Sequence, residues 1–221
     1  AAWYYPDPKP AAAEIRDRGS GEIRIAALNA ASHSIVPRAI ARFQKKHPQV
    51  RITLKVLPTR DVRDLVASGQ FDVGLASDQV DTTGVVHQPF VSRDALCVLP
   101  VGHPLAAKEI ITPVDLDGQP FITFSREDRF TQRIETAMAT AGVAPRVVVE
   151  TVFAPTAVRL VAEGVGVSLV SPHAIDGLDQ SGITVRNFQP GVEVRVLLLF
   201  PTDRPKSRLV RDFVSALMAA R

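Results

Sequence analysis

The feature that most constrains this chain is an alternation of short apolar strands with amphipathic helices. Residues 22–28 alternate apolar and polar side chains, as a strand with one buried face does. Val36, Ile40 and Phe43 then recur at the spacing of a single helix face. Residues 50–56 alternate again, so a second strand follows.

The alternation continues to a third strand. Thr59 is expected to cap a second helix, which ends at Gly69. Residues 71–76 form a short apolar strand after it. The order β-α-β-α-β implies parallel strands that are joined by crossover helices.

A second series of the same kind lies further along the chain. Thr112 and Pro113 predict the capped start of a short helix, and residues 125–128 resemble a capping box at the start of a longer one. We expect strands at 85–91, 95–100, 121–124, 147–152, 167–170, 183–188 and 192–200, and further helices over 155–163 and from Pro205.

Two such series within 221 residues favour an α/β fold of two lobes, joined near Pro100, with a cleft between them. Ligands of open α/β sheets bind at the carboxyl ends of the strands, beside helix N-termini. Six loops are therefore expected to line the cleft: residues 29–34, 58–59, 76–78, 125–128, 153–156 and 170–173.

Composition limits the partners of the chain. The 26 Lys+Arg and 23 Asp+Glu leave a net charge of +3, and no basic block is present to follow a phosphate backbone. The longest apolar run, 194–201, is broken by Arg195 and is far too short to span a bilayer, so no membrane segment is expected. Residues 1–10 resemble neither a signal peptide nor a helix and are interpreted as a linker, tag remnant or extension.

The sequence carries no standard catalytic signature: a P-loop, a GxSxG elbow and an HExxH pair are all missing. The five histidines are not spaced as zinc ligands, and Cys97, the single cysteine, is interpreted as a buried structural thiol. Asp72 is expected to pair locally at the entry of its strand. Gly164 and Gly166 are interpreted as a helix stop and a tight lead into a strand. We therefore expect no cofactor, no metal and no enzymatic activity.

Small polar residues at the predicted strand ends favour a ligand pocket instead. Their alternative role is to cap the helices that follow, and for Ser125 and Thr59 both roles can hold. Because Arg126 and Arg129 flank Ser125, an anionic group is expected near that helix start. The polar set comprises Asn29, Ser32, Ser34, Thr59, Ser77, Ser125 and Thr156.

An ordered set of short motifs runs along the chain: GEIRIA at 21–26, VP at 36–37, Phe43, HP at 47–48, FDVGL at 71–75, LPVGHPL at 99–105, LDGQPFI at 116–122 and VAEGVGVSLV at 161–170. Together these motifs resemble the effector-binding domain of LysR-type transcriptional regulators. The resemblance covers about residues 13–221, nearly the whole chain, and residues 11–18 resemble the tail of the linker helix of that family.

The resemblance implies a periplasmic-binding-protein-like fold of type II, with two Rossmann-like lobes. Residues 1–20 would be linker or tag with the end of the linker helix, residues 21–99 and 196–221 the first lobe, and residues 100–195 the second. It also implies a cytoplasmic homodimer or homotetramer, a small-molecule effector such as a small carboxylate or amino-acid-like metabolite, and promoter DNA bound through a winged helix-turn-helix absent from this chain.

Site residues transfer from the resemblance position by position. The loop after the first strand, with Asn29, Ala30 and Ser32, would close on the ligand, although several members carry serine or threonine where this chain has Ala30. Thr59 matches a position that often contacts the ligand. Further cleft positions are Ser77, Ser125 and the pair Phe153 and Ala154, and Arg126 completes the expected ligand-binding set. The role of His173 stays open, because the proline of this region is shifted by one residue.

Two alternatives use the same scaffold. A solute-binding protein of a transporter would share the fold but would need export. An enzyme is disfavoured, because no acid, base and nucleophile converge in the sequence.

Overall fold

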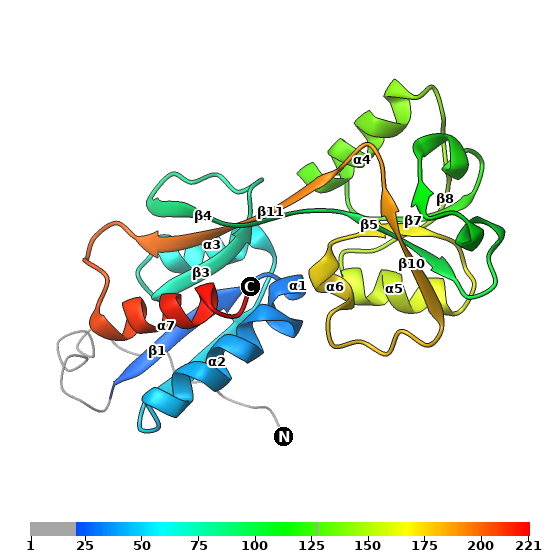
Figure 1. Cartoon of the computed structure of the whole chain (residues 1–221). Coiled ribbons are helices and arrows are strands. Elements are labelled where there is room, and N and C mark those ends of the chain that lie inside the picture. The colour runs from blue at the N-terminus through cyan, green and yellow to red at the C-terminus, as the bar shows by residue number, and fades with distance from the viewer. Residues whose placement is uncertain (1–20, 127) are drawn as a thin grey trace, which may run out of the picture.

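The computed structural model describes residues 21–126 and 128–221, which form two α/β lobes side by side (Figure 1). Residues 1–20 and Glu127 lie outside the described residues, and with them the predicted linker segment. None of the described helices is long and apolar enough to cross a membrane.

The sheet of the first lobe contains five strands in the order β2-β1-β3-β11-β4. The first three pair in parallel, as the sequence predicted, whereas β11 is antiparallel to both β3 and β4. The strands are β1 (Glu22–Ala27), β2 (Arg51–Val56), β3 (Val73–Ser77), β4 (Val85–Asp94) and β11 (Glu193–Pro201).

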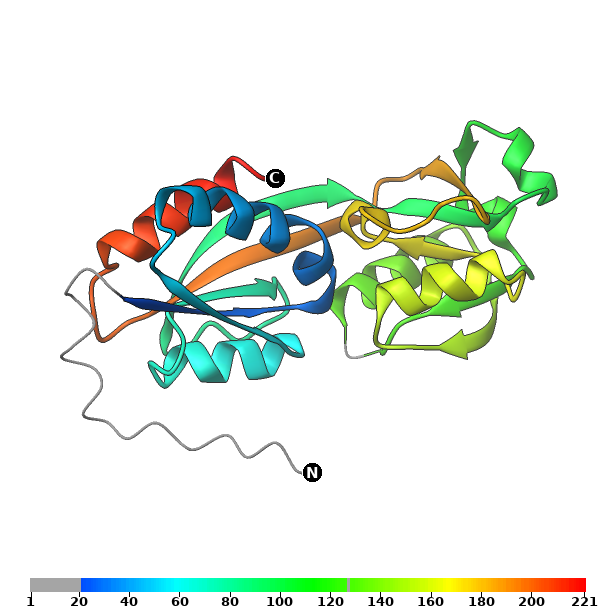
Figure 2. The same ribbon diagram turned by 90° about the horizontal axis from the view of Figure 1, so that it is seen from below.

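Helices cover both faces of this sheet (Figure 2). On one face, α2 (Ile35–Lys46) and α7 (Arg208–Met218) bury the larger core, in which the rings of Phe43 and Phe213 meet edge to face at 5.6 Å. On the other face, α3 (Thr59–Ala67) buries a smaller core. The apolar faces of these helices are therefore used as the sequence pattern requires.

The second lobe has a sheet of order β6-β10-β5-β9 and the parallel pair β7-β8. A bridge between Phe121 and Val167, in which the Ile122 amide donates to the Val167 carbonyl at 2.8 Å, joins the two. The strands are β5 (Leu96–Pro100), β6 (Ile110–Ile111), β7 (Pro120–Thr123), β8 (Arg146–Glu150), β9 (Ser168–Val170) and β10 (Ile183–Phe188). The helices are η2 (Pro104–Ala107), η3 (Pro113–Leu116), α4 (Arg129–Thr140), α5 (Ala154–Ala162) and α6 (Pro172–Ile175).

The chain passes twice between the sheets. Ala95 alone separates β4 from β5, and residues 189–192 separate β10 from β11. Because β11 returns to the centre of the first sheet, α7 completes the first lobe. The sequence placed the boundaries between the lobes after residue 99 and after residue 195, and these boundaries stay predictions.

Three local predictions were wrong. Residues 29–34 were expected as a loop, but Asn29–His33 form a short helix, α1, whose first turn follows β1 directly. Thr59 was expected to cap α3, but Pro58 holds the cap position and Thr59 is the first helical residue. Ser125 was expected to cap α4, but the side chain of Asp128 accepts the hydrogen bond from the Phe130 amide at 2.9 Å.

Other local predictions are confirmed. Thr112 caps η3 in a reciprocal capping box with Asp115. Asp72 is structural: its carboxylate accepts from the Arg24 amide at 2.8 Å and from the Arg204 guanidinium at 3.0 Å. Burial raises the pKa of Cys97 to about 12, which fits a structural thiol rather than a nucleophile.

Gly164 and Gly166 serve two different purposes. Gly164 has a φ of 78°, in the left-handed region that ends a helix. At Gly166, a Cβ would lie 2.5 Å from the carbonyl oxygen of Pro120, so only glycine allows the chain to pass β7 this closely.

Candidate functional site

A cavity of about 400 Å³ lies between the lobes, and all six predicted loops contribute to its lining. The first lobe contributes the residues that follow β1, β2 and β3, and the second lobe those that follow β7, β8 and β9. Strand β11 supplies Val194, Arg195 and Val196 to the wall between them. The cavity therefore occupies the place where open α/β sheets bind ligands.

Seven of the nine predicted site residues line this cavity. From the first lobe come Asn29, Ala30, Thr59 and Ser77, and from the second Ser125, Phe153 and Ala154. Ser32 and Arg126 do not line it. Helix α1 turns the Ser32 side chain into the lobe, where its hydroxyl donates to the Asn29 carbonyl at 2.7 Å, and the 84% exposed Arg126 side chain lies 3.5 Å from Glu135.

Thr59 links two elements of the first lobe at the cavity wall. Its Oγ1 accepts a hydrogen bond from the Ser77 amide at 3.1 Å, which ties the start of α3 to the end of β3. A hydroxyl that accepts in this way keeps its own proton for donation. Thr59 can therefore donate to an acceptor in the cavity.

Helices α3 and α5 both begin at the cavity wall, and neither start is capped by a side chain. The amides of the first turn of a helix have no partner within the helix. The partial positive charge of each helix start adds to the electrostatic attraction between these amides and an anion. Pro155 at the second position of α5 has no amide, so the donors there are those of Ala154 and Thr156.

Helix α4 also begins at the cavity, but its own carboxylate occupies the cap. The Asp128 side chain is partly buried, and one oxygen accepts from the Phe130 amide. Burial raises the pKa of Asp128; the Phe130 amide opposes the rise, the Asp78 carboxylate adds to it, and Arg133 opposes it. An anion is thus disfavoured at this helix start, where the sequence had suggested one.

His173 lies in α6 at the cavity wall and is only 8% exposed. Burial lowers its pKa below 6.5, although the Asp176 carboxylate at 3.6 Å from Nδ1 opposes this effect. Neither ring nitrogen has a hydrogen-bond partner among residues 21–126 and 128–221. The open question about His173 thus resolves to a buried, neutral ring at the cavity.

A group of contacts between the end of β3 and the start of α4, here named the clasp, joins the lobes beside the cavity. The Arg133 guanidinium pairs with the Asp78 carboxylate and donates to the Glu193 carbonyl at 2.9 Å. Arg129 donates through Nη1 to the Asp78 carbonyl at 3.2 Å, and its amide donates to Gln79 Oε1 at 2.8 Å.

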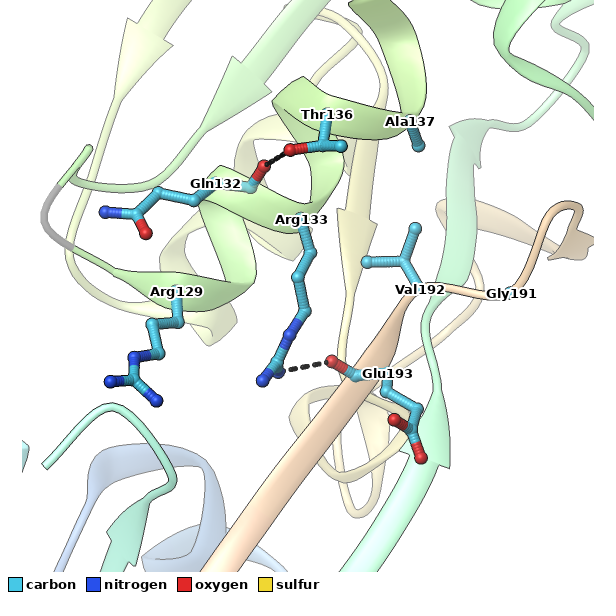
Figure 3. A pocket seen from close by; sticks show the side chains of 8 residues that line it. All are labelled: Arg129, Gln132, Arg133, Thr136, Ala137, Gly191, Val192 and Glu193. Atoms are coloured by element: carbon cyan, nitrogen blue, oxygen red, sulfur yellow. Dashed lines mark hydrogen bonds between the residues drawn. The ribbon is translucent and has the colours of Figure 1, made fainter. Parts of the chain in front are cut away.

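The clasp borders a second, open hollow of about 520 Å³ (Figure 3). Figure 3 shows Arg129, Gln132 and Arg133 extending from α4 on one side of the hollow, and residues 191–193 on the other. Both arginines are already engaged by protein groups.

The predicted ligand-binding set left out several polar or charged cavity residues, including Arg60, and the role of His173 had been left open. Asp128 and His173 lie within predicted cleft loops, so a closer inspection of their charge could have identified them. Gln79 and Arg195 gave no signal, because one follows the expected loop and the other lies inside a strand from the far end of the chain. Within the described ranges, no group of three or more His, Cys, Asp or Glu could hold a metal ion.

Comparison with known proteins shows which family the chain resembles. The LysR substrate binding domain matches residues 16–221. The transcriptional activator protein LysR of Escherichia coli (strain K12) is 33% identical over 219 residues, which cover 99% of this chain and 70% of that protein.

Solved structures share the fold. The cofactor-binding domain of the Cbl transcriptional regulator has a TM-score of 0.83 at 21% identity, with 93% of this chain and 91% of that one covered. The BenM effector binding domain with its effector benzoate has a TM-score of 0.76 at 18% identity, with 90% of each chain covered.

These likenesses confirm the type II periplasmic-binding-protein-like fold and identify relatives that are regulators rather than enzymes. The cavity between the lobes is the candidate site for a small-molecule effector. The chain belongs to the LysR-type family of transcriptional regulators and is an effector-binding domain of that family.

Proposed function

We propose that the cavity binds a small carboxylate or amino-acid-like metabolite, whose carboxylate lies between the starts of α3 and α5. The observation that carries this proposal is that the uncapped start of α3 in the first lobe and that of α5 in the second both line the cavity, with the Thr59 hydroxyl at the start of α3. Backbone amides and a neutral hydroxyl bind a carboxylate without a buried counter-charge. Benzoate, the effector of the BenM domain, is also a carboxylate.

Effector binding would change the relative orientation of the lobes and so the geometry of a homodimer or homotetramer. A ligand shifts such an equilibrium only by its differential affinity for the two arrangements. The cavity draws its walls from both lobes, so its shape depends on how they are oriented. Promoter DNA would be bound in the cytoplasm by a separate helix-turn-helix module, since these 221 residues carry a net charge of only +3. A transport solute-binding role is not favoured, because the relatives are regulators.

The carboxylate placement is tested at Thr59. Titration calorimetry compares small carboxylic acids with their uncharged amides for wild type and for Thr59→Val, which keeps the shape of the side chain and removes the hydroxyl. We expect the acids to bind, the amides to bind far more weakly, and Thr59→Val to lose about tenfold in acid affinity.

Thr140→Val is the matched control, because that hydroxyl donates to the Thr136 carbonyl on the exposed side of α4 and does not line the cavity. Its affinities should equal those of wild type. A domain that binds no acid, or whose acid and amide affinities are equal, contradicts the proposal. Unchanged DNA footprints of a full-length regulator in the presence of a bound acid would contradict the regulatory step.

A further inference from the structure

Asp128 is the one acidic residue in the cavity lining within the described part of the chain. One carboxylate oxygen, Oδ1, caps α4 through the Phe130 amide. Among the described residues no hydrogen bond reaches the other oxygen, Oδ2, and Asp128 lines the cavity. A partly buried carboxylate that is charged and without an ion-pair partner loses hydration without a compensating opposite charge.

Three arginines surround this region, yet each is engaged elsewhere. Arg133 pairs with Asp78 and with the Glu193 carbonyl, and Arg129 donates to the Asp78 carbonyl. Arg195 pairs with Glu193 and lies 3.9 Å from Asp78. The protein therefore neutralises Asp78 and leaves Asp128 as a negative group that faces the cavity.

The surroundings of Asp128 favour a cation from outside the protein. The nearby Asp78 carboxylate repels the negative charge of Asp128, Arg133 offsets part of this repulsion, and partial burial weakens the hydration of Asp128. A ligand cation at Oδ2 would remove both penalties and form a charge-assisted hydrogen bond. A ligand anion at the same place would add to the repulsion. The positive end of a ligand is therefore favoured at Asp128, and the negative end at the uncapped helix starts.

We infer that the effector carries a protonated amine that donates to Asp128 Oδ2, while its carboxylate lies at the starts of α3 and α5. This inference rests on the proposed function and narrows it to zwitterionic amino compounds. The anion end meets uncapped helix starts, and the cation end meets the one helix start that already carries its own carboxylate. Asp128 is thus the residue that selects amino acids against simple carboxylic acids.

The test compares compounds that differ only in the amine. Titration calorimetry measures the twenty encoded amino acids and, for each, the carboxylic acid with hydrogen in place of the 2-amino group. The wild-type domain should bind at least one amino acid about tenfold or more tightly than its partner acid. In Asp128→Asn this preference should disappear, with the affinity for the partner acid retained or increased.

Asparagine is as good a helix cap as aspartate, so Asp128→Asn removes the charge and keeps the cap. Asp128→Ser is a second variant that also caps, and thermal melting confirms that each variant is folded. Asp203→Asn is the matched control, because it removes the same charge from an exposed residue outside the cavity. It should keep the wild-type preference.

The outcomes separate the inference from the proposed function. If carboxylic acids bind and the amine adds nothing, or if the preference survives in Asp128→Asn and Asp128→Ser, the inference is wrong and the carboxylate site stands. If neither amino acids nor carboxylic acids bind the folded wild-type domain, both are wrong.

Discussion

Two aspartates, Asp72 and Asp128, have different roles because their surroundings differ. The Asp72 side chain, 12% exposed, accepts from the Arg24 amide and pairs with Arg204, so its charge is compensated within the protein. Asp128 is partly shielded from solvent, but it forms no ion pair with the described residues. A satisfied carboxylate holds the fold together, whereas an unsatisfied one at a cavity is available for a ligand.

We predict that His173 lowers the free energy of unfolding of the domain in acid. Burial lowers its pKa in the folded state below 6.5, with Arg38 and Arg93 adding to the effect and Asp176 opposing it. Below pH 6.5 the unfolded chain therefore binds more protons than the folded one, and the free energy of unfolding falls by at most about 1.4 kcal/mol per pH unit.

Urea unfolding at a series of pH values from about 7.5 to about 5, the window in which imidazole titrates, measures this slope. His173→Gln should flatten it, while His87→Gln, at an exposed position of β4, should leave it unchanged. An equal slope in wild type and His173→Gln would contradict the assignment.

At the scale of elements, the helix starts divide into two groups. Side chains cap α4, α6 and α7 through Asp128, Ser171 and Ser207, whereas α1, α2, α3 and α5 have no side-chain cap. An uncapped start leaves amides without a partner, which costs stability unless water or a ligand satisfies them. Of these, α1, α3 and α5 begin at the cavity, so an effector gains most at their amides.

We predict that the second lobe depends on Gly166 for its stability. It brings β9 next to β7, where the bridge between Phe121 and Val167 joins the two sheets. Gly166→Ala places a methyl group 2.5 Å from the Pro120 carbonyl oxygen, so β7 must shift. We expect a loss of about 1–3 kcal/mol in the free energy of unfolding, measured by urea denaturation.

Gly164→Ala is the comparison for this prediction. Its Cβ would meet no atom within 4 Å, so only the left-handed backbone conformation resists the change, at about 1–2 kcal/mol. Gly166→Ala should also weaken hydrogen-exchange protection in β7, and Gly164→Ala should not. Normal protection of β7 in Gly166→Ala would contradict the close approach.

The sequence predicted most elements because their periodicity is local. The parallel β1-β2 pair and the apolar faces of α2 and α7 follow from spacing alone. The start of α1 was missed, because residues 29–34 are small and polar and carry no apolar period. The caps at Thr59 and Ser125 were misplaced by one and three residues, since several adjacent polar residues can each cap a helix.

The sequence could predict only those cavity residues that lie in loops directly after predicted strands. Seven residues of the cavity wall follow from the carboxyl-end rule, but the contribution of β11 depends on a pairing between segments more than a hundred residues apart. Ser32 shows the other limit: one additional helical turn directs a side chain away from the cavity.

At the scale of the whole molecule, two ion pairs connect the lobes in different environments. In the clasp, the Asp78 side chain is 11% exposed and Arg133 is 28% exposed. Arg38 and Asp176 pair at 3.3 Å on the other side, with exposed fractions of 49% and 39%. Shielded pairs are costly to break from one side only, whereas exposed pairs contribute little.

We expect Asp78→Asn to open the lobes, because it removes the partner of Arg133 and weakens the wall of the cavity at Gln79. Small-angle X-ray scattering should show a larger radius of gyration for this variant without effector. Asp176→Asn should leave the radius unchanged and cost less than about 0.5 kcal/mol in unfolding free energy. Equal radii for wild type and Asp78→Asn would show that the clasp does not hold the lobes.

The place of β11 in the first sheet has a consequence for synthesis on the ribosome. The second lobe is built from one continuous stretch, so it can fold while translation continues. The first lobe cannot: β3 and β4 both pair with β11, and α2 packs against α7. The nascent first lobe therefore waits, with β4 unpaired and the α2 face uncovered, until residues 193–218 emerge, and this interval is when the chain most needs protection from aggregation.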